Sequence, residues 1–257
     1  MSGRPEVCLT ADADGTMERL FRGLEAVDES GLADWTLIGG LAVMARLAVA
    51  HRATADIDTL VRDAVPNAKA VLLTVAAEAT ASGVRLSDGT KIDAIDVAAV
   101  LDVDGLPDHG DAMRMFALAH WWMAATAEDV QLRLVRTYPA ETVLVRPLRL
   151  ARPAALVAAK LQSIPTRRAR AADKRMSDTF DVYRLLDGDP TFTICAELAE
   201  APSDLGSWCA SFLEDLFVVQ AVRTAGWISQ ASGRRVEPDS LEVLGSLAVE
   251  MVRLHLG

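Results

Sequence analysis

The chain has 257 residues, enough for one large domain or two lobes, and its 51% apolar and 24% charged residues are typical of a folded globular protein. A formal net charge of −10 argues against a protein that coats nucleic acid through general electrostatics. No apolar signal segment or membrane span is apparent, and three widely spaced cysteines are too few for a zinc site or a disulfide framework. We therefore expect a cytoplasmic protein.

The first part of the chain alternates helix and strand patterns. We predict a helix over 16–30, a short buried strand over 35–38 that ends at Gly39-Gly40, and an apolar helix over 41–51. The next predicted elements are a strand over 54–61, a helix over 67–82 and a hairpin over 84–97 that turns at Asp88-Gly89. This half is expected to be α/β, with a sheet flanked by helices.

After residue 105 the pattern weakens, and most of the remaining chain is predicted to be helical. We expect a strand over 142–145, a helix from Pro153 to about 163, and helices over 176–186, 205–229 and 240–255. A boundary near residue 150 separates an α/β domain, 1–150, from a mainly α-helical domain, 151–257.

Two aspartates share one face of the strand over 54–61. Alternation along a strand points Asp56 and Asp58 to one side and Ile57 to the other. At about 6 Å and an effective dielectric of about 20, their repulsion is about 2–3 kcal/mol, which a bound divalent cation reverses. Mg²⁺ prefers oxygen ligands and takes few of them from protein when phosphates supply the others. The competing interpretation of the pair alone is ordinary solvated surface.

The Gly39-Gly40 turn gives the aspartate pair a context. It ends a buried strand and begins a helix, so backbone N–H groups and the positive end of the helix dipole are available to a phosphate. A glycine turn followed by a pair of carboxylates indicates a site for a metal ion and a nucleotide.

The residues around these two features resemble a known family. Ile38-Gly39-Gly40, followed by Arg52-Ala53-Thr54-Ala55-Asp56-Ile57-Asp58, resembles the signature of the polymerase-β-type nucleotidyltransferases, in particular the AbiEii/AbiGii toxin family that includes the MenT toxins. Leu156 to Leu161 with Lys160, then Arg167, and Asp178-Thr179-Phe180-Asp181 resemble that family's downstream block. The resemblance spans about residues 35–190, and Ser177 departs from it where a lysine is common.

The resemblance implies a nucleotidyltransferase-type mixed sheet and a third carboxylate on a later strand. Asp93 and Asp96 are the candidates, and because they are three residues apart they face opposite ways on a regular strand. Periodicity does not choose between them; the match to the family favours Asp93. Its implied role is to bind metal with Asp56 and Asp58 and to help deprotonate the attacking hydroxyl.

Further residues take implied roles from the same family. Lys160 is expected to contact the triphosphate and steady the leaving group, and Thr54, Arg175, Asp178 and Asp181 are expected to line the nucleotide site. The alternatives from the residues themselves are a lysine that extends to solvent, and acids that only stabilise a helix start.

One basic strip stands out on this acidic chain. Residues 146–175 carry nine positive side chains and one negative one. The strip is either a solvated face or a surface that steers triphosphate or guides an RNA end.

The resulting hypothesis is transfer of a nucleoside monophosphate from a nucleoside triphosphate to a hydroxyl, with two Mg²⁺ ions. The resemblance suggests the toxin of a bacterial toxin–antitoxin or phage-defence system, with tRNA as acceptor and a separately encoded antitoxin. The alternatives are an antibiotic-modifying nucleotidyltransferase and a non-catalytic nucleotide-binding module.

Overall fold

The computed structural model describes residues 4–11, 14–52, 54–64, 67–108, 111–137, 140–166, 171–202 and 204–256. It divides into two compact units, one of residues 1–100 and 124–152 and the other of residues 101–123 and 153–257. The break after Arg152 lies close to the predicted boundary, and residues 101–123 group with the C-terminal part of the chain.

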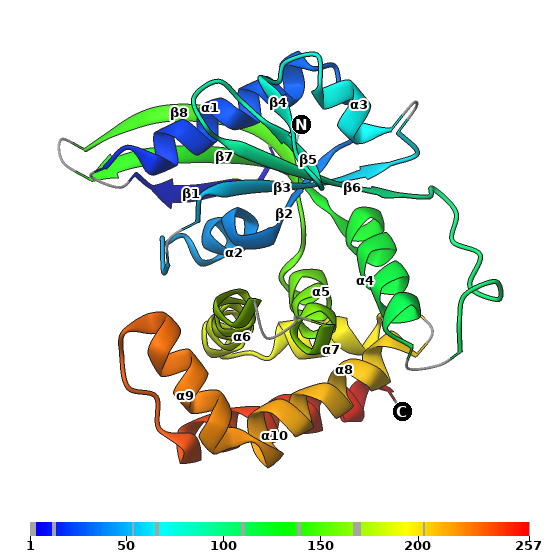
Figure 1. Cartoon of the computed structure of the whole chain (residues 1–257). Coiled ribbons are helices and arrows are strands. Elements are labelled where there is room, and N and C mark those ends of the chain that lie inside the picture. Colours follow the sequence, from blue (N-terminus) through cyan, green and yellow to red (C-terminus); the bar gives the residue numbers. More distant parts are fainter. Residues whose placement is uncertain are drawn as a thin grey trace. The chain divides into compact units, whose positions relative to one another are not determined.

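The first unit is built on a mixed sheet (Figure 1). Within the described residues it has eight strands in the order β1-β7-β8-β2-β3-β6-β5-β4. The central strand β3 runs antiparallel to β2 and parallel to β6, which confirms the expected mixed α/β architecture. The strands are β1 Glu6–Thr10, β2 Thr36–Ile38, β3 Asp56–Arg62, β4 Glu78–Ala79, β5 Gly83–Arg85, β6 Lys91–Val97, β7 Glu128–Thr137 and β8 Ala140–Leu150.

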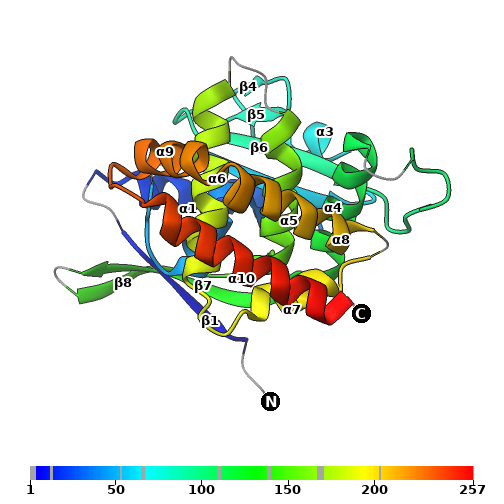
Figure 2. The same ribbon diagram turned by 90° about the horizontal axis from the view of Figure 1, so that it is seen from below.

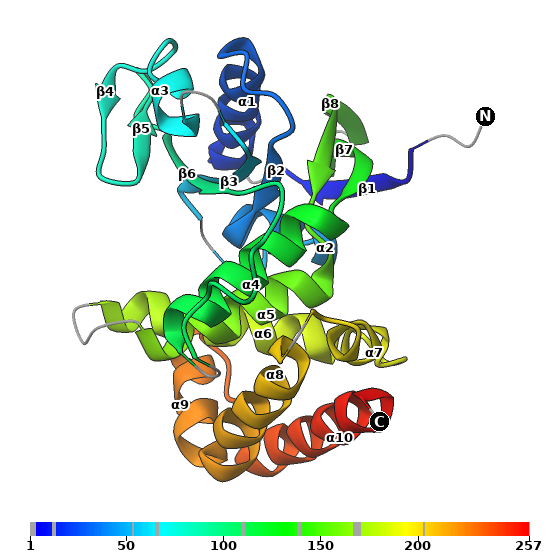
Figure 3. The same cartoon turned by 90° about the vertical axis from the view of Figure 1, so that its right-hand side faces the viewer.

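Helices α1, Thr16–Glu29, and α2, Gly39–Leu47, cover opposite faces of this sheet (Figures 1 and 3). Helix α1 packs on the face to which Ile57 points, because a Cβ on its Gly23 would lie 2.5 Å from Ile57 Cδ1. Ile57 is fully buried there. By strand alternation, Asp56 and Asp58 therefore point to the other face.

Helix α2 ends earlier than predicted. The apolar pattern continues to residue 51, but Ala48 adopts a left-handed conformation with φ of 56°. The N–H of Ala48 donates to Ala45 O and that of Val49 to Met44 O, which is the paired closure of a Schellman motif. The left-handed residue at the C-terminus of the helix thus ends it before the apolar side-chain pattern does.

The predicted helix over 67–82 was wrong beyond its first turns. Helix α3 covers only Ala68–Leu72, with the Asn67 side chain accepting from the N–H of Ala70 at its start. Residues Glu78 and Ala79 instead pair with Arg85 and Val84 at the edge of the sheet. The hairpin of β5 and β6, next to this edge strand, turns at Gly89, as predicted.

Helix α4, Ala112–Thr126, and strand β7 were missed in the part of the chain where the pattern weakens. Strand β7 buries alternate apolar residues, Val130, Leu132 and Leu134, a signal that the sequence carries. Strand β8 extends well beyond the predicted 142–145 and contains Pro147. That proline is tolerated because β2 pairs only with Arg149 and Leu150 of β8.

The second unit is helical, as predicted for the C-terminal part of the chain. Helix α6 packs against α5 and α9, and α10 runs beside α8 and η2 (Figure 2). The predicted helix over 205–229 is instead broken into α8, the π-helical turn η2 and α9, with a bend of 87° after Val219. The remaining helices are α5 Pro153–Thr166, α6 Ala172–Asp187, α7 Thr193–Ala199, α8 Leu205–Leu213, η2 Glu214–Val219, α9 Ala221–Ser232 and α10 Pro238–Leu256.

No single helix among the described residues has the length and apolar character to cross a bilayer, although the bent pair 205–219 and 221–232 satisfies both criteria jointly.

Replacing Gly83 tests the pairing of β5 with β6. A Cβ at this position would lie 2.0 Å from the backbone oxygen of Ile92, so Gly83→Ala must push the strands apart opposite Asp93. We expect the free energy of unfolding to fall by about 1–3 kcal/mol. Urea unfolding followed by circular dichroism measures it. The control is Gly226→Ala, on an open surface of α9, which should be neutral or stabilising by up to about 1 kcal/mol; equal losses in both variants would contradict the prediction.

Candidate functional site

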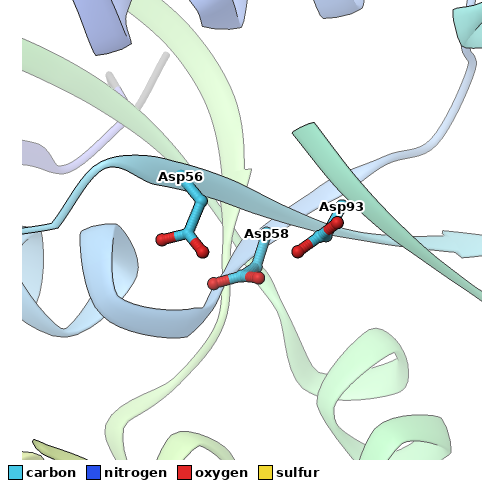
Figure 4. A group of neighbouring side chains, drawn as sticks. All are labelled: Asp56, Asp58 and Asp93. Atoms are coloured by element: carbon cyan, nitrogen blue, oxygen red, sulfur yellow. The ribbon is translucent and has the colours of Figure 1, made fainter. Parts of the chain in front are cut away.

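Three aspartates of the first unit form a carboxylate cluster (Figure 4). Asp56 and Asp58 lie on β3, and the parallel register of β3 and β6 pairs Asp58 with Asp93. One carboxylate oxygen from each of the three residues lies within 4.8 Å of the other two. All three side chains are half-buried, so the cluster is open to a ligand.

Asp96, the other candidate for the third carboxylate, does not join the cluster. Its Oδ1 accepts a hydrogen bond of 3.0 Å from the N–H of Ala68 at the start of α3. The difference follows from strand alternation, since Asp93 and Asp96 point to opposite faces of β6. Among the described residues, the acidic group with metal-binding geometry is Asp56, Asp58 and Asp93.

The cluster fits a hard divalent cation. Two carboxylates 4.8 Å apart repel by about 3 kcal/mol at an effective dielectric of about 20, and each added carboxylate increases this cost. A cation between them reverses the sign of the interaction, and oxygen-only ligands suit Mg²⁺.

Neighbouring side chains orient two of the carboxylates. The Thr54 hydroxyl donates to Asp56 Oδ1 at 3.3 Å. Asp93 accepts from the Ser82 hydroxyl on Oδ1 and from Lys91 Nζ on Oδ2, each at 2.5 Å. Sequence reasoning missed both Asp93 partners. Lys91 precedes Asp93 by two residues on one strand, so alternation alone signals that it shares the carboxylate face.

The Gly39-Gly40 turn borders the cluster because β2 pairs Ile38 with Asp58. Gly39 has φ of +69°, and a Cβ there would lie 1.9 Å from Asp58 Oδ2, so both the backbone and the space require glycine. A Cβ on Gly40 would lie 2.5 Å from the Arg52 guanidinium and 3.1 Å from Thr54 Oγ1. The turn therefore brings the first amides of α2, the Arg52 cation and the carboxylates together.

A second polar cluster lies in the second unit. Lys160 on α5 forms ion pairs of 2.7 Å with Asp178 and 2.8 Å with Asp181, both on α6, and Ser163 donates to Asp178. Lys160 is 8% exposed and Asp181 is fully buried. Lys160 therefore does not extend to solvent, and the two aspartates do more than stabilise a helix start. Whether this triad binds nucleotide stays a prediction.

The basic strip is not one charged face. Arg146 pairs with Asp28 and Glu25, and Arg152 pairs with Glu128. Arg149 donates to the backbone oxygen of Ala124. Three of the strip's nine cations, Arg146, Arg152 and Lys160, are thus paired with acids within the fold. Arg167, Arg168 and Arg170 lie outside the described residues.

The buried cysteines are not thiolate nucleophiles. Cys195 and Cys209 are free, and burial raises the pKa of Cys195 to about 12 and that of Cys209 further. Both thiols stay protonated at neutral pH, so covalent thiolate chemistry is not available to them.

The carboxylate cluster predicts selective stabilisation by Mg²⁺. Binding to the folded state alone contributes about 2.7 kcal/mol at a hundredfold excess over Kd, which raises the melting temperature by several degrees. Asp93→Asn should abolish this Mg²⁺-dependent shift, whereas Asp96→Asn should retain it. Thermal unfolding with and without Mg²⁺ measures both, and loss of the shift in the Asp96 variant alone would assign the third metal ligand to Asp96 instead of Asp93.

The Lys160 triad predicts a large stability loss in Lys160→Met. Removing the cation leaves two buried carboxylates without it, a change that typically costs about 3–5 kcal/mol. The control is Lys174→Met, an exposed cation on α6 that should stay within about 0.5 kcal/mol of wild type. Chemical denaturation compares the two variants, and near-equal midpoints would show that the triad contributes little to stability.

Comparison with known proteins identifies the family. The family model described as nucleotidyl transferase AbiEii toxin, Type IV TA system, matches residues 22–204. A search of curated proteins finds no match. The matched region includes the glycine turn, the three aspartates and the Lys160 triad, and it covers more than half of the chain. The chain belongs to the AbiEii family of nucleotidyltransferase toxins of type IV toxin–antitoxin systems.

Proposed function

We propose that this protein transfers a nucleoside monophosphate from a nucleoside triphosphate to a hydroxyl of RNA, with the 3′ end of tRNA as the acceptor. The observation that carries the proposal is the group of three carboxylates within 4.8 Å, bordered by the glycine turn that begins α2. The family supports the reaction class, because it consists of nucleotidyltransferase toxins.

Asp56, Asp58 and Asp93 are the proposed metal ligands. When bound by these residues, two Mg²⁺ ions would neutralise charge at the triphosphate and lower the pKa of the acceptor hydroxyl. Thr54 orients Asp56 through its hydroxyl, and Ser82 and Lys91 fix both oxygens of Asp93. This arrangement holds the carboxylates in place before substrate arrives, which is how positioning and charge lower a barrier.

The reaction needs an in-line displacement at the α-phosphorus. The acceptor oxygen forms a bond to this phosphorus, the bond to the bridging oxygen of the β-phosphate breaks, and pyrophosphate leaves. Asp93 takes the proton of the attacking hydroxyl. The amides of Gly39 and Gly40 donate to phosphate oxygens, since the side chain of Ile38 cannot cap this helix start.

Residues of the second unit are also proposed to bind the nucleotide. Asp178 and Asp181 position Lys160 through two short ion pairs, and we propose that this ammonium contacts the triphosphate and the departing pyrophosphate. Arg175 was predicted for the same role, and its guanidinium lies over the ring of Trp227. The family implies a cognate antitoxin. We also propose a cytoplasmic location, because the proposed substrates, nucleoside triphosphate and tRNA, are found there.

Labelled nucleotides test the proposal directly. Purified protein is incubated with Mg²⁺, total tRNA and each of the four labelled nucleoside triphosphates in turn. Label should appear on RNA with the wild type and with Asp96→Asn, and fall by several orders of magnitude in Asp56→Ala/Asp58→Ala, because the double variant lacks two of the three carboxylates.

The other outcomes point to different functions. Pyrophosphate release only with small hydroxylated compounds would assign antibiotic modification instead. Failure of calorimetry to detect Mg²⁺-dependent nucleotide binding, together with no transfer, would favour a non-catalytic binding module.

A further inference from the structure

Two arginines of the second unit lie over one tryptophan. The guanidinium carbon of Arg175, on α6, is 4.8 Å from the centre of the Trp227 ring, and that of Arg223, on α9, is 4.4 Å from it. Trp227 is itself on α9, half-buried, and α6 packs along α9. Two chain segments about 50 residues apart in sequence therefore present two guanidiniums on one indole.

These two cations are not neutralised within the described part of the chain. Arg223 donates to the side-chain oxygen of Gln220, an uncharged partner, and the buried Nε of Arg175 has no hydrogen-bond partner. No carboxylate of the described residues forms an ion pair with either one. The arrangement differs from that of Arg114, Arg146 and Arg152, each of which is paired with an acid.

An aromatic ring holds a guanidinium without cancelling its charge. The attraction comes from the quadrupole of the ring, so this contact does not use up the N–H donors of the guanidinium. Two like charges near one ring repel each other, and negative charge brought near them offsets this repulsion. The cluster is therefore suited to a ligand with negative charges.

Phosphate is the anion that best suits the hydrogen-bonding chemistry of a guanidinium. The planar fork of arginine donates two parallel hydrogen bonds to a phosphate, and packing against Trp227 limits the freedom that binding removes. Cations held against an aromatic ring are typical of surfaces that bind single-stranded nucleic acid.

We propose that Arg175, Trp227 and Arg223 form a binding platform for the phosphodiester backbone of the RNA acceptor. This inference rests on the proposed function, in which the triphosphate already has the glycine turn, the metal-binding carboxylates and Lys160. None of those residues is proposed to bind the RNA acceptor, so the acceptor needs a binding surface of its own.

RNA binding by the full chain tests the platform. Binding of labelled total tRNA is measured by fluorescence polarisation at several salt concentrations for wild type, Arg175→Gln/Arg223→Gln and Arg235→Gln. Arg235 is the matched control, since its exposed side chain is paired with Glu237 in the same unit. We expect the double variant to bind about tenfold more weakly, with a salt slope smaller by about 1.4, because each phosphate contact to a single strand contributes about 0.7. The control should change neither quantity.

Variants of Trp227 separate positioning from charge. Trp227→Leu keeps both cations but removes the ring, and it should weaken RNA binding, while Trp227→Phe should restore part of the loss. Thermal unfolding of each variant shows whether the fold is intact, and equal RNA affinity of the folded leucine and phenylalanine variants would overturn the role of the ring.

Two results would overturn the platform itself. RNA affinity and salt slope in the double variant equal to those of wild type would remove these arginines from acceptor binding. Loss of Mg²⁺–nucleotide affinity in calorimetry, with RNA binding retained, would assign Arg175 to the triphosphate. Failure of the proposed function can be told apart from failure of the platform. If the proposed function is wrong, the wild type labels no RNA. If the wild type labels RNA and the double variant keeps its KM for RNA, only the platform is wrong.

Discussion

The parallel register between β3 and β6 is the constraint on which the candidate site depends. It places Asp58 opposite Asp93 and so holds together carboxylates that repel each other. The ladder is maintained by what lies on the other face, where Ile57 and Ile92 are fully buried. Burial of apolar side chains on one face of the sheet thus holds the strands together, although the carboxylates on the opposite face repel one another. Lys91 offsets part of the charge at Asp93, and a divalent cation can offset more.

The glycines of the first unit follow from this constraint. Because β2 pairs Ile38 with Asp58, the next residue of the chain meets the Asp58 carboxylate, and only a residue without a Cβ fits there. On the opposite face Gly23 allows α1 to approach Ile57 closely. The same strand therefore requires a glycine on each side, one to admit a carboxylate beside a helix start and one to complete the core.

Local sequence patterns predicted the single elements of this protein better than they predicted how distant segments pair. Alternation along β3 was sufficient to place Asp56 and Asp58 on one face, and the Asp88-Gly89 turn predicted the hairpin. Alternation could not choose Asp93 over Asp96, because the choice depends on which face of β6 adjoins β3, a contact between residues 35 apart. The end of α2 at Ala48 and the pairing of Glu78 and Ala79 with β5 are also set by backbone geometry and tertiary contact. The signals of β7 and Lys91 were present in the sequence and were missed.

The sequence also does not reveal which charged side chains are available to a substrate. The sequence groups nine cations in one strip, but the fold pairs Arg146, Arg152 and Lys160 with acids, so sequence clustering overstates the charge available to a ligand. Arg175 instead lies over an indole and forms no ion pair with an acid of the described residues. On a chain of net charge −10, long-range attraction of RNA is weak, and screening at physiological salt limits each charge to about 8 Å. Recognition of the proposed RNA acceptor would therefore rely on a few cations held at contact distance, whose positions matter more than the net charge.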